Sequence, residues 1–242
     1  MSLAKEGWRE MLLAALVLAG VGWAVSLLHP LAVIPIALVW AWVIAFFRDP
    51  RRVGRFAAGE MCAPADGTVT EVVRLPEHDL LAGPVIRIGI FLSIFNVHIN
   101  RAPCAGVVRD VRYTPGKFLD ARHPDSGPLN EANALIIDRS TPGAGACAVR
   151  QVAGLIARRI ICHARAGTRL ERGERFGLIK FGSRTELIVP DRGDVDICVQ
   201  PGDKVRAGLT VMLRARAAAT AEITDRERSH EGGSESTAVA TG

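Results

Sequence analysis

With 242 residues, 49% of them apolar, and a mean hydropathy of +0.21, the chain has room for one medium-sized domain plus an anchor and is too apolar to be disordered. Its five cysteines are an odd number without a Cys-x-x-Cys pair, which argues against a disulfide framework or a structural zinc site and suits a reducing compartment. The net charge of +5 comes mainly from arginine, since 4 of the 30 basic residues are lysine, and it points to nucleic acid or anionic lipid as a partner.

The N-terminal part has the composition of a membrane anchor. Residues 11–47 contain no Asp, Glu, Lys or Arg, and the pair His29-Pro30 divides them into apolar segments of 18 and 17 residues. Each segment is just short of the about 20 residues that a helix needs to cross a bilayer. Basic residues flank the run on both sides, which places both ends on the cytoplasmic side. We predict a hydrophobic helical hairpin over residues 1–47; the flanking basic residues are Lys5, Arg9, Arg48, Arg51, Arg52 and Arg55.

Two other interpretations of this run stay open. A cleaved signal peptide would need a small-residue cleavage site after the first segment, and none follows it. Pro35 interrupts the second segment, so a shallow re-entrant hairpin competes with a full crossing. With an anchor present, the basic charge fits phospholipid headgroups better than nucleic acid, and the single tyrosine speaks against a site that stacks unpaired bases.

Residues 48–216 differ from the anchor in composition and residue pattern. Short runs of β-branched residues alternate with Gly, Pro and Asp, and helical periodicity is scarce, a pattern typical of a mainly β body of short strands. Residues 217–242 hold little that could be buried, so we predict a disordered tail there. The expected strands are residues 68–73, 85–91, 107–113, 134–138, 149–156 and 187–189.

A weak internal repeat suggests the kind of β fold. Residues 166–173 and 201–208 both contain Gly, an apolar residue three positions later and Gly again after three more. Such turns are typical of lipoyl-like and sandwich-hybrid barrels, where glycine supplies the positive φ of a tight corner. Residues 65–69, Ala-Asp-Gly-Thr-Val, resemble the hairpin entry of the same fold. The alternative is that these are ordinary glycine turns; two matched turns favour the barrel.

The pair Gly182-Ser183, between two apolar runs, is the first candidate for chemistry. By composition alone, Gly-Ser between strands is a hairpin turn. A serine directly after a glycine is also well placed to attack its own peptide bond, since glycine leaves its carbonyl carbon open and tolerates strained dihedral angles. Because a serine hydroxyl is a poor nucleophile at neutral pH, this attack needs a base.

His98 is the best candidate for that base among the six histidines. Strand alternation would place Asn96, His98 and Asn100 on one face. On the residues alone, such a polar face is more simply the solvent side of an edge strand. Asp66, before Gly67, is likewise more often a turn former than a catalytic carboxylate.

Four motifs stand in order along the body: A-P-A-D-G at residues 63–67, V-H-x-N-R-A-P at 97–103, G-K-F at 116–118 and R-F-G-L-I-K-F-G-S-R at 175–184. Together they resemble phosphatidylserine decarboxylase proenzymes, most closely their short bacterial and archaeal form. The resemblance covers residues 48–214, and the two-segment anchor is similar to the same form. The Gly-Ser motif in its long context is highly specific, whereas Ala-Asp-Gly alone is weak.

The resemblance implies that the precursor cuts itself between Gly182 and Ser183, leaving a large chain of residues 1–182 and a small chain of residues 183–242. Ser183 would become a pyruvoyl group, the cofactor, which takes the place of pyridoxal phosphate by forming a Schiff base with the amine of phosphatidylserine. Asp66, His98 and Ser183 resemble the self-processing triad, with His98 as base and Asp66 orienting it. His98 is also the candidate that protonates the α-carbon after CO2 leaves.

The chain departs from the family pattern at one position. Longer members carry two histidines three residues apart, and here the second position is Arg101. Either His98 serves both processing and protonation, or another group takes one of these steps. Arg101, Lys117 and Phe118 are expected to bind substrate, and no metal is expected.

The expected partners are a phospholipid substrate and the cell membrane, with the body on the cytoplasmic side. The two chains of one precursor are expected to stay partners of each other. A homo-oligomer is compatible with the sequence, and nucleic acid is not an expected partner.

Two other functions compete with the decarboxylase. A Ser-His-Asp lipid esterase would usually carry a G-x-S-x-G elbow, which the sequence lacks. A membrane-anchored barrel adaptor would tolerate loss of Ser183. No feature of the sequence reports on the tails of the lipid, so a substrate with the same headgroup chemistry on different tails is an alternative.

Overall fold

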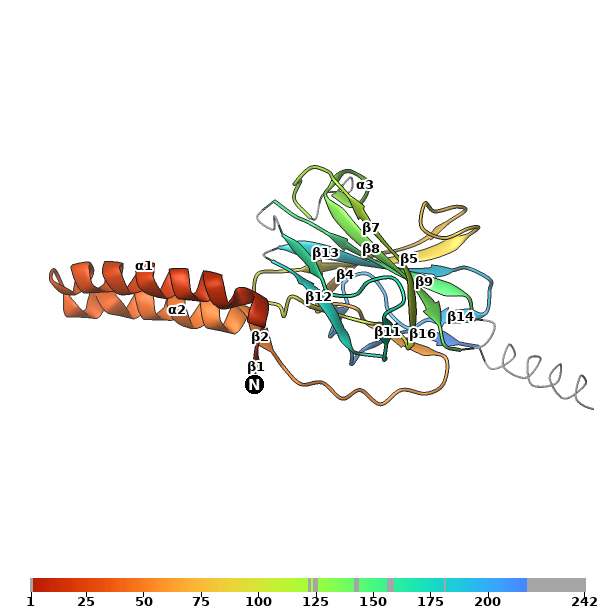
Figure 1. Ribbon diagram of the computed structural model, residues 1–242, viewed down its shortest axis with the longest axis horizontal. Coiled ribbons are helices and arrows are strands. Elements are labelled where there is room, and N and C mark those ends of the chain that lie inside the picture. Colours follow the sequence, from red (N-terminus) through yellow and green to blue (C-terminus); the bar gives the residue numbers. More distant parts are fainter. Residues whose placement is uncertain are drawn as a thin grey trace, which may run out of the picture.

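The architecture is a helical hairpin that projects from one end of a β-rich body (Figure 1). The computed structural model describes residues 2–121, 123, 126–141, 144–155, 159–180 and 182–216. The mainly β, barrel-like fold and the N-terminal pair of apolar helices expected from the sequence are confirmed. The predicted tail lies outside the described residues.

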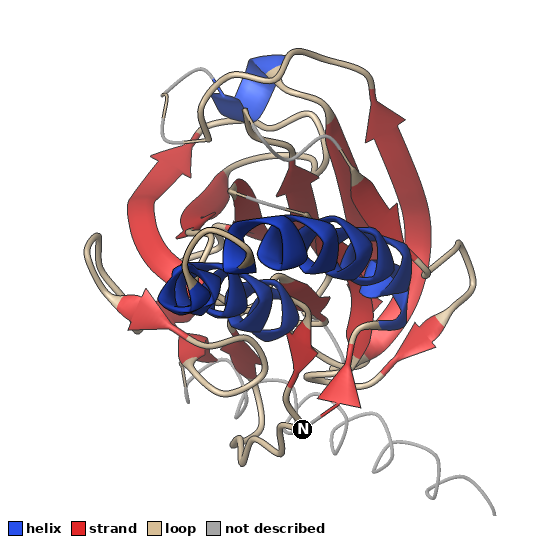
Figure 2. Ribbon diagram, turned by 90° about the vertical axis from the view of Figure 1, so that its left-hand side faces the viewer, coloured by secondary structure: helices blue, strands red, loops and turns tan. Residues whose placement is uncertain are grey.

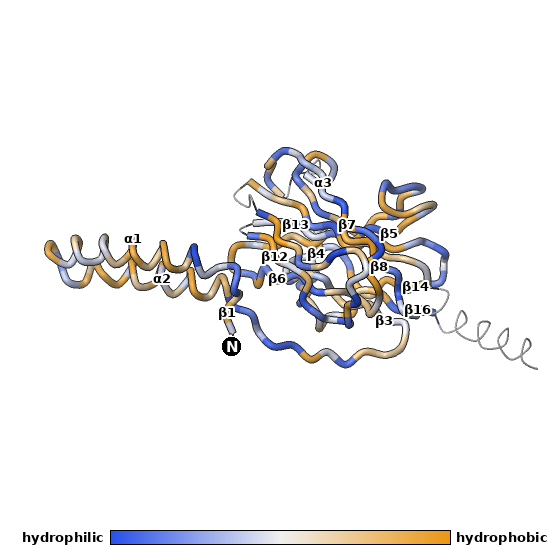
Figure 3. The backbone as a smooth tube through the Cα atoms, in the orientation of Figure 1, coloured by the Kyte–Doolittle hydropathy of each residue, from blue (hydrophilic) through white to orange (hydrophobic). Residues whose placement is uncertain are grey.

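The hairpin consists of α1 (Trp8–Ser26) and α2 (Val33–Phe46), preceded by the 3-10 turns η1 (Lys5–Gly7) and η2 (Pro30–Ala32). The run Lys5–Ser26 is long and apolar enough to cross a membrane, and Pro30–Phe46 is a shorter apolar helix. Pro35 lies in the first turn of α2, where its missing N–H has no helical acceptor, so it does not break the helix. Apolar residues occur along the whole length of the hairpin, which extends away from the body (Figure 3).

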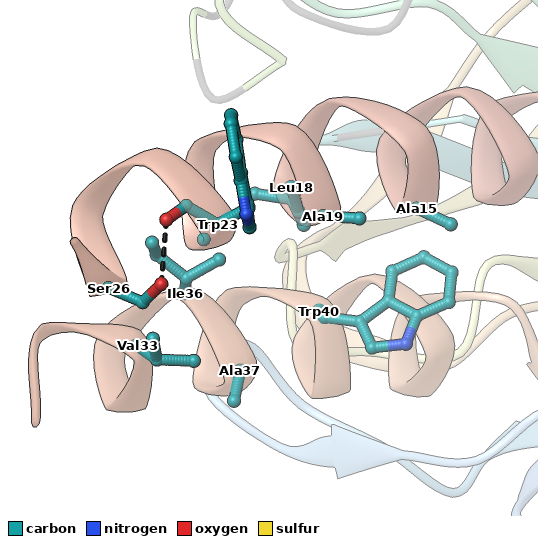
Figure 4. A pocket seen from close by; sticks show the side chains of 10 residues that line it. Ala15, Leu18, Ala19, Trp23, Ser26, Val33, Ile36, Ala37 and Trp40 are labelled. Carbon is teal, nitrogen blue, oxygen red and sulfur yellow. Dashed lines mark hydrogen bonds between the residues drawn. The ribbon is translucent and has the colours of Figure 1, made fainter. Parts of the chain in front are cut away.

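A groove of about 540 Å³ lies between the two helices (Figure 4). Ala15, Ala19 and Ala37 line it with small side chains, and Trp23 and Trp40 stand beside them. Small residues let helix backbones approach closely where no water drives their association. The lining is apolar, as suits helices surrounded by hydrocarbon.

The base of the hairpin is joined to the body. β1 (Ser2–Leu3) pairs antiparallel with β2 (Arg48–Asp49), so the chain enters and leaves the hairpin at one place. Asp49 then accepts hydrogen bonds from Arg101 at 2.9 Å and from Arg175 at 3.0 Å. These partly buried ion pairs fix the hairpin relative to the strands that carry Arg101 and Arg175.

One large antiparallel sheet and two smaller ones form the body, seen along the hairpin in Figure 2. The large sheet has the order β11-β7-β8-β9-β13-β5-β4-β15, and the small sheets have the orders β10-β12-β6 and β14-β16-β3. Fully buried side chains such as Ile90, Leu187 and Phe176 fill the interior. The strands and the short helix are β3 (Glu60–Cys62), β4 (Gly67–Leu75), β5 (Val85–Leu92), β6 (Ile99–Arg101), β7 (Gly106–Thr114), α3 (Ser126–Leu129), β8 (Ala132–Arg139), β9 (Ala146–Val152), β10 (Ile160–Cys162), β11 (Arg169–Leu170), β12 (Arg175–Ile179), β13 (Ser183–Pro190), β14 (Val195–Ile197), β15 (Lys204–Val205) and β16 (Val211–Ala215).

The two repeated glycine turns occupy equivalent places at opposite edges of the large sheet. Gly167 and Gly202 have φ angles of +86° and +98°, and each donates a 2.8 Å hydrogen bond to the neighbouring strand. β11 follows the first turn and β15 follows the second. Their second glycines, Gly173 and Gly208, lie against each other, since a Cβ on Gly208 would sit 3.4 Å from the Cα of Gly173. The large sheet is therefore curled like half a barrel, with the turns at its two edges in contact.

Candidate active site

The Gly182-Ser183 peptide bond lies where the chain passes from a small sheet to the large one. β12 ends at Ile179 and β13 begins at Ser183, so a short connection spans the two sheets. Just before it, Lys180 is buried and its Nζ contacts Glu10 of α1 and, at 3.0 Å, the carbonyl of Glu6. The bond therefore lies at the end of the body that carries the hairpin.

Both sides of this bond have unusual surroundings. The Ser183 side chain is fully buried, and among the described residues its Oγ has no hydrogen-bond partner. Gly182 has a φ of +58°, a conformation that glycine adopts without steric cost. Its carbonyl oxygen rests on the Cα of Gly154, where any side chain would collide with it. The Gly182 carbonyl thus lies in a space that exists only because residue 154 is glycine.

His98 is buried, with 2% of its surface exposed. Its Nδ1 lies 3.0 Å from the carbonyl of Asn96, so Nδ1 carries the proton and Nε2 keeps its lone pair. Nε2 is buried and has no hydrogen-bond partner among the described residues. The pKa of His98 is lowered to about 4, mainly by burial and to a smaller extent by Arg48, against the Asn96 carbonyl and Asp66, which raise it. The imidazole is therefore neutral at pH 7 and able to accept a proton.

Asp66 is held by other groups. Both Nη atoms of Arg52 contact its carboxylate, one of them at 2.7 Å, and the N–H of Ala207 donates to it at 2.8 Å. No hydrogen bond joins Asp66 to His98 in the part of the chain that the structure describes. Asp66 acts on His98 through charge, and the carbonyl of Asn96 orients the ring.

A buried chain of amides connects the His98 segment to the Ser183 strand. Asn100 donates to the Oγ1 of Thr185 at 3.0 Å and accepts from the Nε2 of Gln151 at 2.9 Å. Asn133 completes the chain by donating to Gln151 at 3.0 Å. His98 and Ser183 each lie two residues from the Asn100–Thr185 hydrogen bond, so this bond sets the spacing of the segments that carry them.

The solvent-exposed polar face considered for residues 96–100 is wrong. His98 and Asn100 are buried, and β6 covers only Ile99–Arg101. Asn96 lies in the preceding turn, where its Oδ1 accepts a 2.9 Å hydrogen bond from the N–H of Ser93. Alternation along one strand does not describe this segment because a turn interrupts it.

The three residues expected to bind substrate have different surroundings. Arg101 is buried and its guanidinium is engaged by Asp49 and by the Gly173 carbonyl, at 2.9 and 3.0 Å. Lys117 is exposed and Phe118 is half-buried. Lys117 and Phe118 belong to the loop that leads to Ala121, whose Cβ lies beside Gly154. Arg101 is thus occupied in holding the hairpin base, and the loop of Lys117 reaches the neighbourhood of the scissile bond.

Sequence reasoning missed three residues of this site. The sequence pattern marks Arg52 only as a charge beside the anchor and Phe46 only as part of the anchor, and it predicts Gly154 within a strand that in the structure ends at Val152. The ring of Phe46 packs on His98 with 4.4 Å between centroids. No local pattern marks these residues, because each acts on a partner far away in the sequence.

The surroundings of Ser183 fit the pyruvoyl group that the motifs imply. Among the described residues the buried Oγ has no hydrogen-bond partner, and the preceding glycine has open space where a Cβ would lie, which suits conversion of Ser183 within the folded chain. Among the described residues, no group of three or more His, Cys, Asp or Glu side chains is placed to hold a metal ion.

Comparison with known proteins agrees with the motifs. The family model for phosphatidylserine decarboxylase matches residues 39–213. The phosphatidylserine decarboxylase proenzyme of Rhodopirellula baltica is 46% identical over 205 residues, which cover 84% of this chain and 83% of that protein. The proenzyme of the same name from Nitrosomonas eutropha is 42% identical over 219 residues, covering 88% of this chain and 95% of that one.

Proposed function

The chain belongs to the phosphatidylserine decarboxylase family, and we propose that it is a membrane-anchored proenzyme that cuts itself at Gly182-Ser183 and then converts phosphatidylserine to phosphatidylethanolamine and CO2. The observation that carries the proposal is the buried Oγ of Ser183, which has no hydrogen-bond partner among the described residues and directly follows Gly182, a glycine with a φ of +58° and open space where a Cβ would lie. The proposed domains are the anchor of residues 1–47, the body of residues 48–216 and the tail of residues 217–242.

The self-cleavage uses residues of the chain alone. Nε2 of neutral His98 takes the hydroxyl proton of Ser183, and Oγ attacks the carbonyl carbon of Gly182. The C–N bond breaks as the C–O bond forms, and the proton held by His98 moves to the nitrogen, which leaves an ester and a free amine on Ser183. Loss of the Ser183 α-proton then breaks the Cβ–Oγ bond and frees residues 1–182 with a terminal carboxylate. The dehydroalanine left at residue 183 reacts with water, releases ammonia and becomes the pyruvoyl group.

The pyruvoyl group supplies a carbonyl that binds the substrate amine and accepts the electrons released with CO2. Decarboxylation leaves a carbanion that must be protonated, and we propose that His98, once its Nε2 has taken up a proton, is the donor. Arg101 is held by Asp49, so it is not the donor. A His98→Ala chain should therefore lose activity.

The position of the site suits a substrate that stays in the bilayer. The site adjoins the hairpin, whose length and hydropathy suit a membrane anchor, and the flanking arginines favour a cytoplasmic body. Phe95 and Leu155 are 68% and 61% exposed; the Phe95 carbonyl accepts a hydrogen bond from Arg48, and Leu155 follows Gly154. These apolar side chains would rest in the headgroup layer while the headgroup reaches Ser183.

Intact mass spectrometry of the purified full-length chain tests the proposal. We expect two chains that meet between Gly182 and Ser183, the smaller lighter by one ammonia than a peptide that begins with serine. The same preparation should release CO2 from phosphatidylserine vesicles. Ser183→Ala should remain one inactive chain, and Ser140→Ala, at a serine in a loop after β8, should be cut like the wild type. A single uncut wild-type chain contradicts the proposal, and ester hydrolysis by that chain would favour the esterase.

A further inference from the structure

The last residue of α2 lies directly on the candidate catalytic base. The ring of Phe46 is tilted 37° to the imidazole of His98, with 4.4 Å between centroids. Both side chains are 2% exposed. Phe46 therefore covers a face of His98 from outside the β body, and this cover comes from the hairpin.

A hydrogen bond and packing contacts at the base of the hairpin hold Phe46 in this position. The N–H of Ala4 donates to the carbonyl of Phe47 at 2.8 Å. The ring of Phe47 fills the space beside Gly7, where a Cβ would collide with it, and packs edge-on against Phe46 at 5.0 Å. Ala4 itself is buried among apolar side chains of the small sheet. Packing thus locks the end of α2 to the body.

We propose that Phe46 is a positioning residue of the active site: its ring holds the imidazole of His98 in place and keeps water from it, so the hairpin is part of the catalytic centre as well as its anchor. This inference rests on the proposed function for the role of His98. It extends that function by tying self-cleavage to the docking of the hairpin base.

The charge state of His98 is the property that reports this contact. The charged groups that face the ring are Arg48 from β2 and Asp66 from the segment before β4. Their opposite effects leave burial as the main reason that the pKa of His98 is low. A residue that only stabilised the fold would not alter this pKa, whereas removal of a ring that excludes water should raise it toward the ordinary value of about 6.5.

The direct test is NMR titration of isotope-labelled histidine in the full-length Ser183→Ala chain in detergent, with His98→Gln to assign the signal. We expect the pKa of His98 to rise by at least one unit in Phe46→Ala, by less in Phe46→Val, and to stay near the wild-type value in Phe46→Leu, which refills the space. Phe47→Ala is the matched control for Phe46→Ala, because it removes an equally buried ring from the same end of the hairpin without uncovering His98. It should leave the pKa unchanged.

A second measurement follows self-cleavage against pH in chains that retain Ser183. The wild-type rate should stay nearly constant from pH 8 to pH 5.5, because His98 remains neutral there. In Phe46→Ala, a pKa near 6.5 would protonate most of His98 at pH 5.5 and slow cleavage about tenfold at that pH.

The proposal is overturned if His98 titrates alike in the wild type and in folded Phe46→Ala, or, should Phe46→Ala not fold, in the wild type and Phe46→Val. A rise in Phe47→Ala equal to that in Phe46→Ala also overturns it. The titration needs no enzymatic activity, so a wild-type chain that is neither cut nor active would contradict the proposed function and leave the test of Phe46 intact.

Discussion

The position of the Gly182 carbonyl depends on the lack of a side chain at Gly154. The carbonyl oxygen of Gly182 occupies the space in which a Cβ of residue 154 would lie, and Ala121 closes the neighbouring side. An attack by Oγ on a carbonyl needs the reacting atoms in register, and displacements of about 1 Å can cost about a hundredfold in rate. In the proposed self-cleavage, the backbone at residue 154 would therefore affect the rate although it donates no functional group.

Gly154→Ala should therefore slow self-cleavage by about ten- to a hundredfold, since the new methyl group must displace the Gly182 carbonyl. Gel analysis of newly synthesised chains over time measures the rate. Gly20→Ala is the control, because Gly20 has open space around its Cβ position. If both variants were cut at the wild-type rate, the close approach at Gly154 would have no role in processing.

At the scale of elements, the site depends on the register between β6 and β13. These strands belong to different sheets, and no backbone ladder joins them. The fully buried pair Asn100 and Thr185 joins them instead, and Gln151 of β9 holds Asn100 from the other side. Buried amide chains of this kind specify one arrangement, because each member left alone costs free energy.

Asn100→Leu should lower the free energy of unfolding by about 2 kcal/mol, since Thr185 and Gln151 lose their partner in the interior. Self-cleavage should slow as well, because the spacing of His98 and Ser183 is no longer fixed. Denaturant unfolding of the uncut Ser183→Ala chain measures the first effect. The double variant Asn100→Leu with Thr185→Val should recover part of the stability, and unchanged stability of the single variant would contradict the role of this chain of amides.

At the scale of the whole molecule, cleavage at Gly182-Ser183 would not divide the fold into two parts. β13, which would begin the small chain, pairs along its length with β5 and with β9 of the large chain. β15 and β16 of the small chain likewise pair with β4 and β3. The two chains would therefore share one core.

After processing, the two chains should elute together in size-exclusion chromatography in detergent and separate only in denaturant, since paired central strands and buried side chains hold them. High salt should not separate them, because apolar burial is not screened. Elution of a free small chain without denaturant would show that the interleaved sheet does not hold after cleavage.

The sequence by itself determined the helical hairpin, the mainly β body with its matched glycine turns, and the family motifs around Gly182-Ser183. Each of these is recorded in residues that are neighbours in the chain, as hydropathy, as local conformation or as a motif. Tertiary structure alone decided that Arg52 holds Asp66, that Gly154 receives the Gly182 carbonyl, and that Phe46 covers His98. The partners in these contacts are 14, 28 and 52 residues apart, and their side chains meet only because sheets and hairpin pack together, which no local pattern encodes.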